Sequence, residues 1–238
     1  MIVLLRAVDL ETTGLAPPEC VIEIGWSDVY WDTDERTAEI MAPQSRLFTP
    51  TRPITPENRA VHHIADADFD GHVACTDEAL EDILCKDEPF ALVAAHAAFE
   101  QQWLAPGITG DAKWICTVKA AARLFPEAES HSNQAIRYRL GLHLPEALAM
   151  PPHRAGPDAY VTANILAAML ETASVNQLLK WTREPKFLPR CPLGKWKGKA
   201  WPEVEHSYLE WILRTADMDP DVQHAARQEI ARRVGEGA

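Results

Sequence analysis

The chain has 238 residues, of which 47% are hydrophobic and 24% are charged, and its formal net charge is -12. This composition is typical of a globular protein, and the acidic balance argues against a protein that holds nucleic acid through an overall positive charge. The five cysteines include no Cys-x-x-Cys pair, which argues against a disulfide framework or a zinc knuckle and favours a cytoplasmic location.

The first predicted strand is an apolar run that begins at residue 2 and carries Asp9 and Glu11 near its end. Arg6 and Asp9 interrupt this run too early for a signal peptide, and no stretch reaches the roughly 20 apolar residues that span a membrane. Side chains two residues apart on a strand point to one face, so the two carboxylates repel each other unless a cation lies between them. Carboxylates suit Mg²⁺ or Mn²⁺, although two solvated acids at a strand end remain an alternative.

Two further strands are predicted directly after the first. Residues 21–31 are rich in Val, Ile and aromatic side chains, and residues 38–48 predict a third strand in which Pro43 introduces a bend. Consecutive strands with short connections indicate an antiparallel meander.

Helices and strands alternate in the following part of the chain. The predicted elements are a helix from residue 56 toward His62, a helix over 76–85, a strand over 90–95, a helix over 99–104, a strand over 114–116, and helices over 117–124, 132–140 and 155–173. Strands followed by alternating strands and helices predict an α/β or α+β domain over residues 1–175.

The last part of the chain has a different composition. Residues 176–201 contain seven basic residues against one acid, and three prolines interrupt them, so residues 176–192 are predicted to form a basic linker. Residues 193–238 are predicted to form a small, mainly helical module, with helices near 207–214 and 221–234.

Two later segments place a histidine and an acid beside a strand end or a helix start. His96 follows the predicted strand over 90–95, with Glu100 four residues later, and His153 precedes the longest predicted helix, with Asp158 in its first turn. Such positions are the usual location of sites in α/β folds. Taken singly, each acid could instead complement a helix dipole, and each histidine could be an ordinary core or surface residue.

Together, the three acidic segments resemble the motifs of the DEDDh 3′-to-5′ exonuclease family. The first family motif, Asp-x-Glu-Thr-x-Gly, corresponds to Asp9-Leu10-Glu11-Thr12-Thr13-Gly14. The second, which begins with His and ends in Phe-Asp, corresponds to His96-Ala97-Ala98-Phe99-Glu100. The third, His-x-Ala-x-x-Asp, corresponds to His153-Arg154-Ala155-Gly156-Pro157-Asp158.

Further segments resemble the exodeoxyribonuclease X branch of this family and extend the likeness over nearly the whole chain. They lie within residues 114–126, 132–133 and 194–213, and residues 53–64 resemble the substrate-contacting stretch of the wider family. The resemblance implies a set of substrate-binding residues, namely Thr12, Thr13, Leu15, His62, Ile64, His96 and Phe99. From the residues alone, Leu15 could instead pack within a turn, and Ile64 could belong to the core.

The resemblance also implies a fold and a chemistry. The fold is ribonuclease H-like, with a mixed sheet flanked by helices, and the cofactors are two Mg²⁺ (or Mn²⁺) ions. The implied metal ligands and catalytic acids are Asp9, Glu11, Glu100 and Asp158. His153 is the implied general base, because an imidazole titrates near neutral pH.

The implied reaction is the release of 5′ mononucleotides from DNA 3′ ends, single-stranded or duplex, in DNA repair or end processing. Family members are often dimers, which leaves a homodimer open. An RNA-trimming enzyme of the same family is an alternative, because the acid cluster does not distinguish ribose from deoxyribose. A catalytically weak end-binding module is another, because Glu100 stands where the family has Asp and Mg²⁺ demands near-octahedral geometry. We expect activity to be retained.

The basic tail is the last candidate site. Its lysines alternate with aromatic residues, which suits stacking on unpaired bases beside phosphates, whereas a merely solvated run of charges is the alternative. The candidate DNA-binding residues are Lys195, Trp196, Lys197, Lys199 and Trp201.

Overall fold

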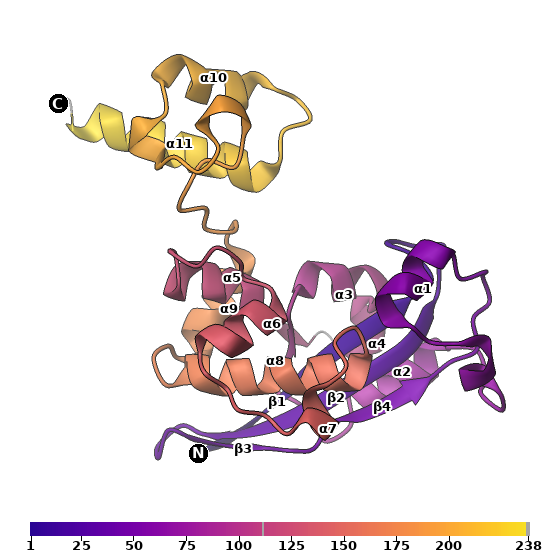
Figure 1. Ribbon diagram of the computed structural model, residues 1–238. Coiled ribbons are helices and arrows are strands. Elements are labelled where there is room, and N and C mark those ends of the chain that lie inside the picture. The colour runs from indigo at the N-terminus through magenta and orange to yellow at the C-terminus, as the bar shows by residue number, and fades with distance from the viewer. Residues whose placement is uncertain (111, 237–238) are drawn as a thin grey trace.

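The computed structural model describes residues 1–110 and 112–236 and shows an α/β body joined to a small helical unit at the C-terminal end (Figure 1). Within these residues, strands of the body form one sheet. They are β1 (Ile2–Thr12), β2 (Val21–Asp32), β3 (Thr37–Ile40), β4 (Gln44–Leu47), β5 (Ala91–Ala94) and β6 (Lys113–Cys116). Their order is β3-β2-β1-β5-β6, and β4 also pairs with β2. Strands β1 to β4 pair antiparallel and β5 and β6 pair parallel, which confirms the predicted mixed sheet.

Helices lie on both faces of the sheet. Those of the body are α1 (Pro56–His62), α2 (Asp77–Leu84), α3 (Ala97–Trp103), α4 (Pro106–Thr109), α5 (Thr117–Leu124), α6 (Asn133–Arg139), α7 (Glu146–Ala149), α8 (Ala155–Leu170) and α9 (Val175–Arg183). Helices α10 (His206–Arg214) and α11 (Pro220–Glu236) belong to the C-terminal unit. Short 3₁₀ turns form at Asp66–Phe69, Gly194–Trp196 and Trp201–Glu203. Within residues 1–110 and 112–236, no helix combines the length and apolar character that crossing a membrane requires.

The region predicted as one bent strand over 38–48 is two short strands instead. β3 and β4 both pair with β2, and the chain between them, which contains Pro43, belongs to neither strand. Proline cannot donate a backbone hydrogen bond, so pairing stops around it and resumes further along β2.

The region predicted as a linker begins with a helix. Leu178 and Leu179 of α9 are buried in the main core of the body, and the Thr182 hydroxyl accepts a hydrogen bond of 2.8 Å from the Cys116 backbone N–H of β6. Helix α9 is therefore part of the body. The extended segment that leads to the C-terminal unit starts only after Arg183 (Figure 1).

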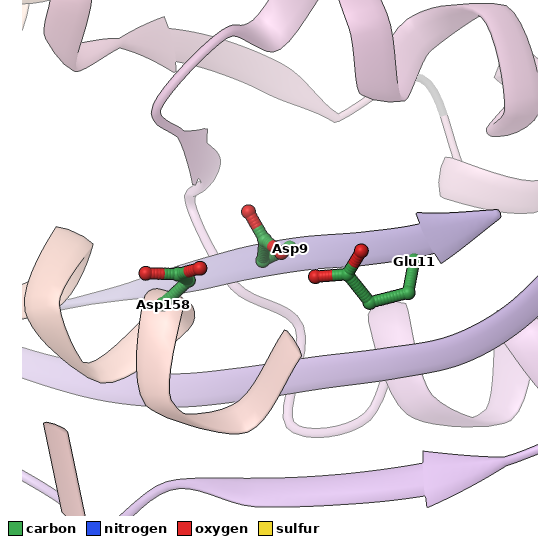
Figure 2. A group of neighbouring side chains, drawn as sticks. All are labelled: Asp9, Glu11 and Asp158. Carbon is green, nitrogen blue, oxygen red and sulfur yellow. The ribbon is translucent and has the colours of Figure 1, made fainter. Parts of the chain in front are cut away.

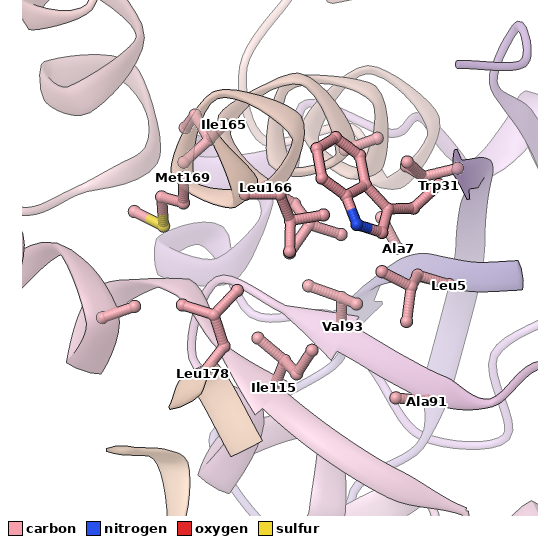
Figure 3. Packing of buried hydrophobic residues seen from close by; sticks show 14 of the residues in the cluster. Leu5, Ala7, Trp31, Ala91, Val93, Ile115, Ile165, Leu166, Met169 and Leu178 are labelled. Atoms are coloured by element: carbon pink, nitrogen blue, oxygen red, sulfur yellow. The ribbon is translucent and has the colours of Figure 1, made fainter. Parts of the chain in front are cut away.

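The alternation of side chains along β1 divides the interior into two cores. Leu5 and Ala7 belong to the cluster that packs against α8 and α9 (Figure 3), whereas Val8 and Leu10 belong to the cluster under α2, α3 and α4. Residues two apart on a strand share a face. The row of side chains that starts with Leu5 and Ala7 therefore continues into Asp9 on the face that α8 covers.

The C-terminal unit has a core of its own. Trp201, Leu209, Ile212 and Val222 are buried together there with residues of α11. The indole N–H of Trp201 donates a hydrogen bond of 2.7 Å to the Leu188 carbonyl oxygen, so Trp201 also holds the end of the extended segment.

Helix α8 lies against the sheet at Gly25 of β2. A Cβ atom on Gly25 would lie 2.0 Å from the carbonyl carbon of Ala155 and 2.2 Å from the backbone nitrogen of Gly156. No side chain fits at such distances, so glycine at this position is what lets the start of α8 reach the sheet. Because Gly25 pairs with Asp9 of β1, the same contact brings the first turn of α8 beside Asp9.

We expect Gly25→Ala to lower the free energy of unfolding by about 3 kcal/mol, because the new methyl group would have to displace backbone rather than a flexible side chain. Urea unfolding followed by circular dichroism measures this change. Gly107→Ala is the matched control, since a Cβ there meets nothing within 4 Å, and it should be neutral or stabilising by up to about 1 kcal/mol. Equal stabilities of the two variants would contradict the importance of this contact.

Candidate active site

Three acids from two elements meet at the end of β1. Asp9 and Glu11 project from the strand, and Asp158 projects toward them from the first turn of α8 (Figure 2). One carboxylate oxygen from each lies within 4.8 Å of the others, which is a spacing that allows all three to bind a metal ion. The period of the strand and the approach of α8 at Gly25 together produce this cluster.

Glu100 lies in the same pocket but outside the tight cluster of three. Its side chain is 3% exposed and comes from α3, and it lines the pocket together with Asp9, Glu11 and Asp158. Its Oε2 atom is buried and has no hydrogen-bond partner among the described residues. A buried carboxylate oxygen without a partner is costly, and a cation in the pocket would satisfy it.

The electrostatics of the four carboxyl groups favour a proton or a cation at each. Burial is the main cause that raises the pKa of Asp9, and Glu11 and Asp158 add to the shift. The pKa of Glu11 rises to about 8 through burial and then the charge of Glu23. Burial likewise raises the pKa of Glu100 to about 8 and raises that of Asp158. Divalent cations with oxygen-only ligands, such as Mg²⁺ or Mn²⁺, would relieve this repulsion, so the residues present fit the implied metal ions.

His153 lies at the edge of the pocket, directly before α8. Its side chain is exposed and lines the pocket, and its backbone adopts a left-handed conformation with φ of 60°. The His153 backbone N–H donates a hydrogen bond of 2.6 Å to Oδ2 of Asp158. This bond closes the turn that holds the histidine and the aspartate at fixed positions relative to each other.

An ion pair between half-buried Arg154 and buried Glu23 anchors the same turn to the sheet, and sequence reasoning missed it. Glu23 of β2 is 1% exposed, and its two carboxylate oxygens accept hydrogen bonds of 2.9 Å and 3.0 Å from Arg154. A third bond, of 3.2 Å, reaches Glu23 from the Ala155 backbone N–H. Glu23 pairs with Glu11 across the strands, so Arg154 also neutralises an acid beside the cluster. An acid within the apolar run Val21-Ile22-Glu23-Ile24 was the available signal for this partner.

The pocket has a volume of about 260 Å³ and contains most of the predicted substrate-binding residues. Those that line it are Thr12, Leu15, His62, His96 and Phe99. Leu15 is 81% exposed, so its side chain projects into solvent at the pocket mouth rather than packing in a turn. Asn58, which sequence reasoning missed, also lines the pocket, and its side-chain amide donates a hydrogen bond to the Thr13 carbonyl oxygen.

His62 presents a free nitrogen within the pocket lining. Its ring is 2% exposed, and Nδ1 accepts a hydrogen bond of 3.0 Å from the Ile64 backbone N–H. Nε2 is buried without a hydrogen-bond partner in the described part of the chain. Burial lowers the pKa of His62, so the neutral ring carries its proton on Nε2 and can donate it to a bound molecule.

Two of the predicted substrate-binding residues do not line the pocket. Ile64 is completely buried and packs with Ile22 and Phe69, which is the core role that the sequence left open. Thr13 is 1% exposed. Its hydroxyl donates to Glu19 at 2.7 Å and accepts from the Cys20 backbone N–H at 3.0 Å. Both residues therefore shape the loops behind the pocket.

The candidate DNA-binding tail is only partly exposed. Trp201 is buried in the core of the C-terminal unit, so its predicted stacking on bases is wrong for this structure. Lys195 and Lys199 pair with Glu205 and Glu203 at 3.1 Å and 3.8 Å. Trp196 is partly buried and Lys197 is exposed. The sequence pattern failed here because it could not show which aromatic side chains the unit uses as its core.

The fold and the acidic pocket define a class of protein. A mixed sheet that carries a buried carboxylate cluster at the end of its first strand is the arrangement of ribonuclease H-like nucleases, which hydrolyse phosphodiester bonds with divalent metal ions. A protein-family model described as RNase_T, exonuclease, matches residues 7–166, more than half of the chain. The chain therefore belongs to this exonuclease family, and it is a phosphodiester hydrolase.

Individual relatives confirm the predicted branch. Exodeoxyribonuclease 10 of Escherichia coli strain K12 is 30% identical over 226 residues, which cover 92% of this chain and 96% of that protein. A solved structure of exonuclease X in complex with 5′ overhanging duplex DNA is 30% identical, covers 75% of this chain and 99% of that one, and gives a TM-score of 0.59. A full-length 3′-exonuclease structure, 17% identical with a TM-score of 0.54 over 71% of this chain and 61% of that one, shares the fold.

The raised carboxyl pKa values predict how metal-free protein responds to pH. Glu11 and Glu100 have an ordinary pKa of 4.5 and a folded pKa of about 8, so the folded state holds more protons between these values and stability falls as pH rises. In EDTA, we expect the melting temperature to fall by about 5 °C between roughly pH 5 and pH 8.5. Mg²⁺ or Mn²⁺ should restore it at the higher pH.

Thermal unfolding followed by circular dichroism measures this effect, and Glu11→Gln is the control. The amide cannot ionise, so the fall in EDTA should be smaller in this variant. A fall as large as that of the wild type would mean that the pH response originates elsewhere.

Proposed function

We propose that the protein is a metal-dependent 3′-to-5′ exodeoxyribonuclease that releases 5′ mononucleotides from DNA 3′ ends. The observation that carries this proposal is the meeting of Asp9, Glu11 and Asp158 within 4.8 Å, beside the unpartnered oxygen of Glu100. Four acids, three of them buried, line one pocket and repel one another, and bound cations would offset this repulsion. Because the chain belongs to the exonuclease family, phosphodiester hydrolysis is the reaction that we assign to this cluster.

Asp9, Glu11, Glu100 and Asp158 are the residues that would hold two Mg²⁺ or Mn²⁺ ions. When bound, such ions activate water for attack on phosphorus and neutralise the charge that develops on the phosphate oxygens. The carboxylates would hold these ions at the end of β1, which is where the scissile phosphate would then bind. Arg154 keeps Glu23 neutralised, so that this fifth acid does not compete with them.

His153 is the proposed general base. Its ring is exposed at the pocket, and an imidazole nitrogen there can accept the proton of the attacking water. The bond from its backbone N–H to Asp158 holds it beside the acids. The left-handed backbone there costs about 1 kcal/mol or more, which the surrounding turn must offset.

The shape of the pocket supports action at ends rather than within a strand. Its volume of about 260 Å³ is close to the lower limit for small-molecule sites and suits a single nucleotide. The exposed side chains of Leu15 and Val61 offer apolar contacts to the terminal base, and the free Nε2–H of His62 offers a donor. None of these contacts reads a base edge in a groove, so we expect little sequence preference.

DNA is the proposed substrate because two relatives that are 30% identical to the chain have names that refer to DNA, one as an exodeoxyribonuclease and one in complex with duplex DNA. A structure of a 3′-exonuclease with a histone mRNA stem-loop is only 16% identical, so it supports the fold and not an RNA substrate. A homodimer and a role in DNA repair stay predictions of the resemblance.

Digestion of 3′-labelled single-stranded DNA, duplex DNA and RNA tests the proposal. With Mg²⁺ or Mn²⁺ we expect labelled 5′ mononucleotides from DNA, no cleavage in EDTA, and at least tenfold slower cleavage of RNA. His153→Ala should lower kcat by about 10²- to 10⁴-fold, as expected for the loss of a general base. RNA as the faster substrate would support the alternative enzyme, and unaltered DNA would support an end-binding module.

Replacement of Glu100 tests the departure from the family pattern. The wild type should be active as it stands, and Glu100→Asp should change kcat by less than about tenfold, with a shift in the ratio of Mg²⁺ to Mn²⁺ activity, because the carboxylate withdraws by one methylene group. Glu100→Gln removes the charge and should lower kcat by about 10²-fold or more. Activity that appears only in Glu100→Asp would show that the longer acid disables the wild-type site.

A further inference from the structure

A second cleft lies between the body and the C-terminal unit. It has a volume of about 560 Å³, and the extended segment after α9 lines it through Lys186 and Phe187. Arg123 of α5 lines it from the body, and His224 and Gln228 of α11 line it from the C-terminal unit. The cleft is therefore formed by three separate parts of the chain.

Hydrogen bonds hold the extended segment on both sides. The Arg123 guanidinium donates to the Pro185 carbonyl oxygen at 2.8 Å and pairs with Glu184 at 3.1 Å. The Lys186 backbone N–H donates to Asp221 of α11 at 2.9 Å. The body therefore holds the segment at Glu184 and Pro185, and the C-terminal unit holds it at Lys186. The segment thus forms an ordered side of the cleft.

The cleft offers an aromatic ring and a positive charge. Phe187 is 40% exposed. The side chain of Lys186 is half-buried and has no ion pair within residues 1–110 and 112–236. The two acids of the lining are each paired with arginine, Glu184 with Arg123 and Glu229 with Arg233. Cations beside an exposed ring are what unpaired nucleic acid requires, since its phosphates are charged and every base can stack.

Helix α5 connects this cleft to the active site. Its Val118 backbone N–H donates a hydrogen bond of 3.1 Å to the carbonyl oxygen of Ala95, which lines the catalytic pocket. Arg123 lies five residues further along the same helix, which is a rise of about 8 Å at 1.5 Å per residue. After partial desolvation, the positive charge of Lys186 is the second cause that lowers the pKa of His96 at the pocket. The cleft therefore begins within a few nucleotide steps of the pocket.

We propose that this cleft binds the unpaired strand upstream of the 3′ end, with Lys186 against a phosphate and Phe187 stacked on a base. The inference rests on the proposed function and deepens it, because it assigns the C-terminal unit a part in binding the same DNA strand. The proposed DNA contact lies in the cleft and not on the loop from Lys195 to Lys199. Trp201 contributes to the cleft by holding Leu188 of the extended segment.

Binding of fluorescein-labelled oligothymidylates to the full chain, in Ca²⁺ to prevent cleavage, tests the proposal by fluorescence anisotropy. For an oligonucleotide of about 20 residues, Lys186→Ala should raise Kd about fivefold and lower the slope of log Kd against log salt by about 0.7, the loss of one phosphate contact. Phe187→Ala should raise Kd about tenfold with no change in slope, because stacking involves no counterion. For an oligonucleotide of about three residues, both effects should be much smaller, since it does not reach the cleft.

Lys86→Ala is the matched control. Lys86 is an exposed lysine before β5, at the opposite end of that strand from His96, and its removal should leave Kd and the salt slope as in the wild type. The proposal is overturned if both cleft variants bind the long oligonucleotide within twofold of the wild type, or if they lose as much affinity for the short one. Cleavage of DNA by the wild type is scored separately, so failure of the proposed function would be distinct from failure of the cleft.

Discussion

The contact between α8 and Gly25 of β2 is the constraint on which the site depends. It lets the start of a helix meet a sheet without a side chain between them, and so it brings a carboxylate of α8 to two carboxylates of β1. The repulsion among these acids works against the contact, since burial and mutual charge raise their pKa values. In the metal-free protein, the dense packing at Gly25 and the ion pair of Glu23 and Arg154 have to outweigh this repulsion.

Local patterns in the sequence predicted the parts of the site that depend on spacing along the chain. Asp9 and Glu11 followed from the period of a strand, and Asp158 from its place in a helix start, and each lies in the pocket. Arg154 and Asn58 were not found, because their function depends on partners far away in sequence, Glu23 and the backbone of Thr13. The fold brings such partners together from distant parts of the chain, so no motif of fixed spacing in the sequence reveals them.

Burial was the property that the sequence predicted least well. Ile64, Thr13 and Trp201 have the residue types of contact positions, but all three are enclosed by the protein. The same difficulty hid α9, where basic residues and later prolines suggested a linker although Leu178 and Leu179 complete the main core. Composition averages over a segment, whereas burial is decided by which face meets a neighbour.

The position of α9 determines where the enzyme can be divided. A shortened protein that ends at residue 175 would lose Leu178 and Leu179 from the core, at a cost of about 2 to 5 kcal/mol for each, and would leave the Cys116 backbone N–H without the Thr182 hydroxyl. A shortened body therefore has to extend at least through Arg183 to keep its core intact. Any comparison of catalysis with and without the C-terminal unit must be made with a body that keeps this helix.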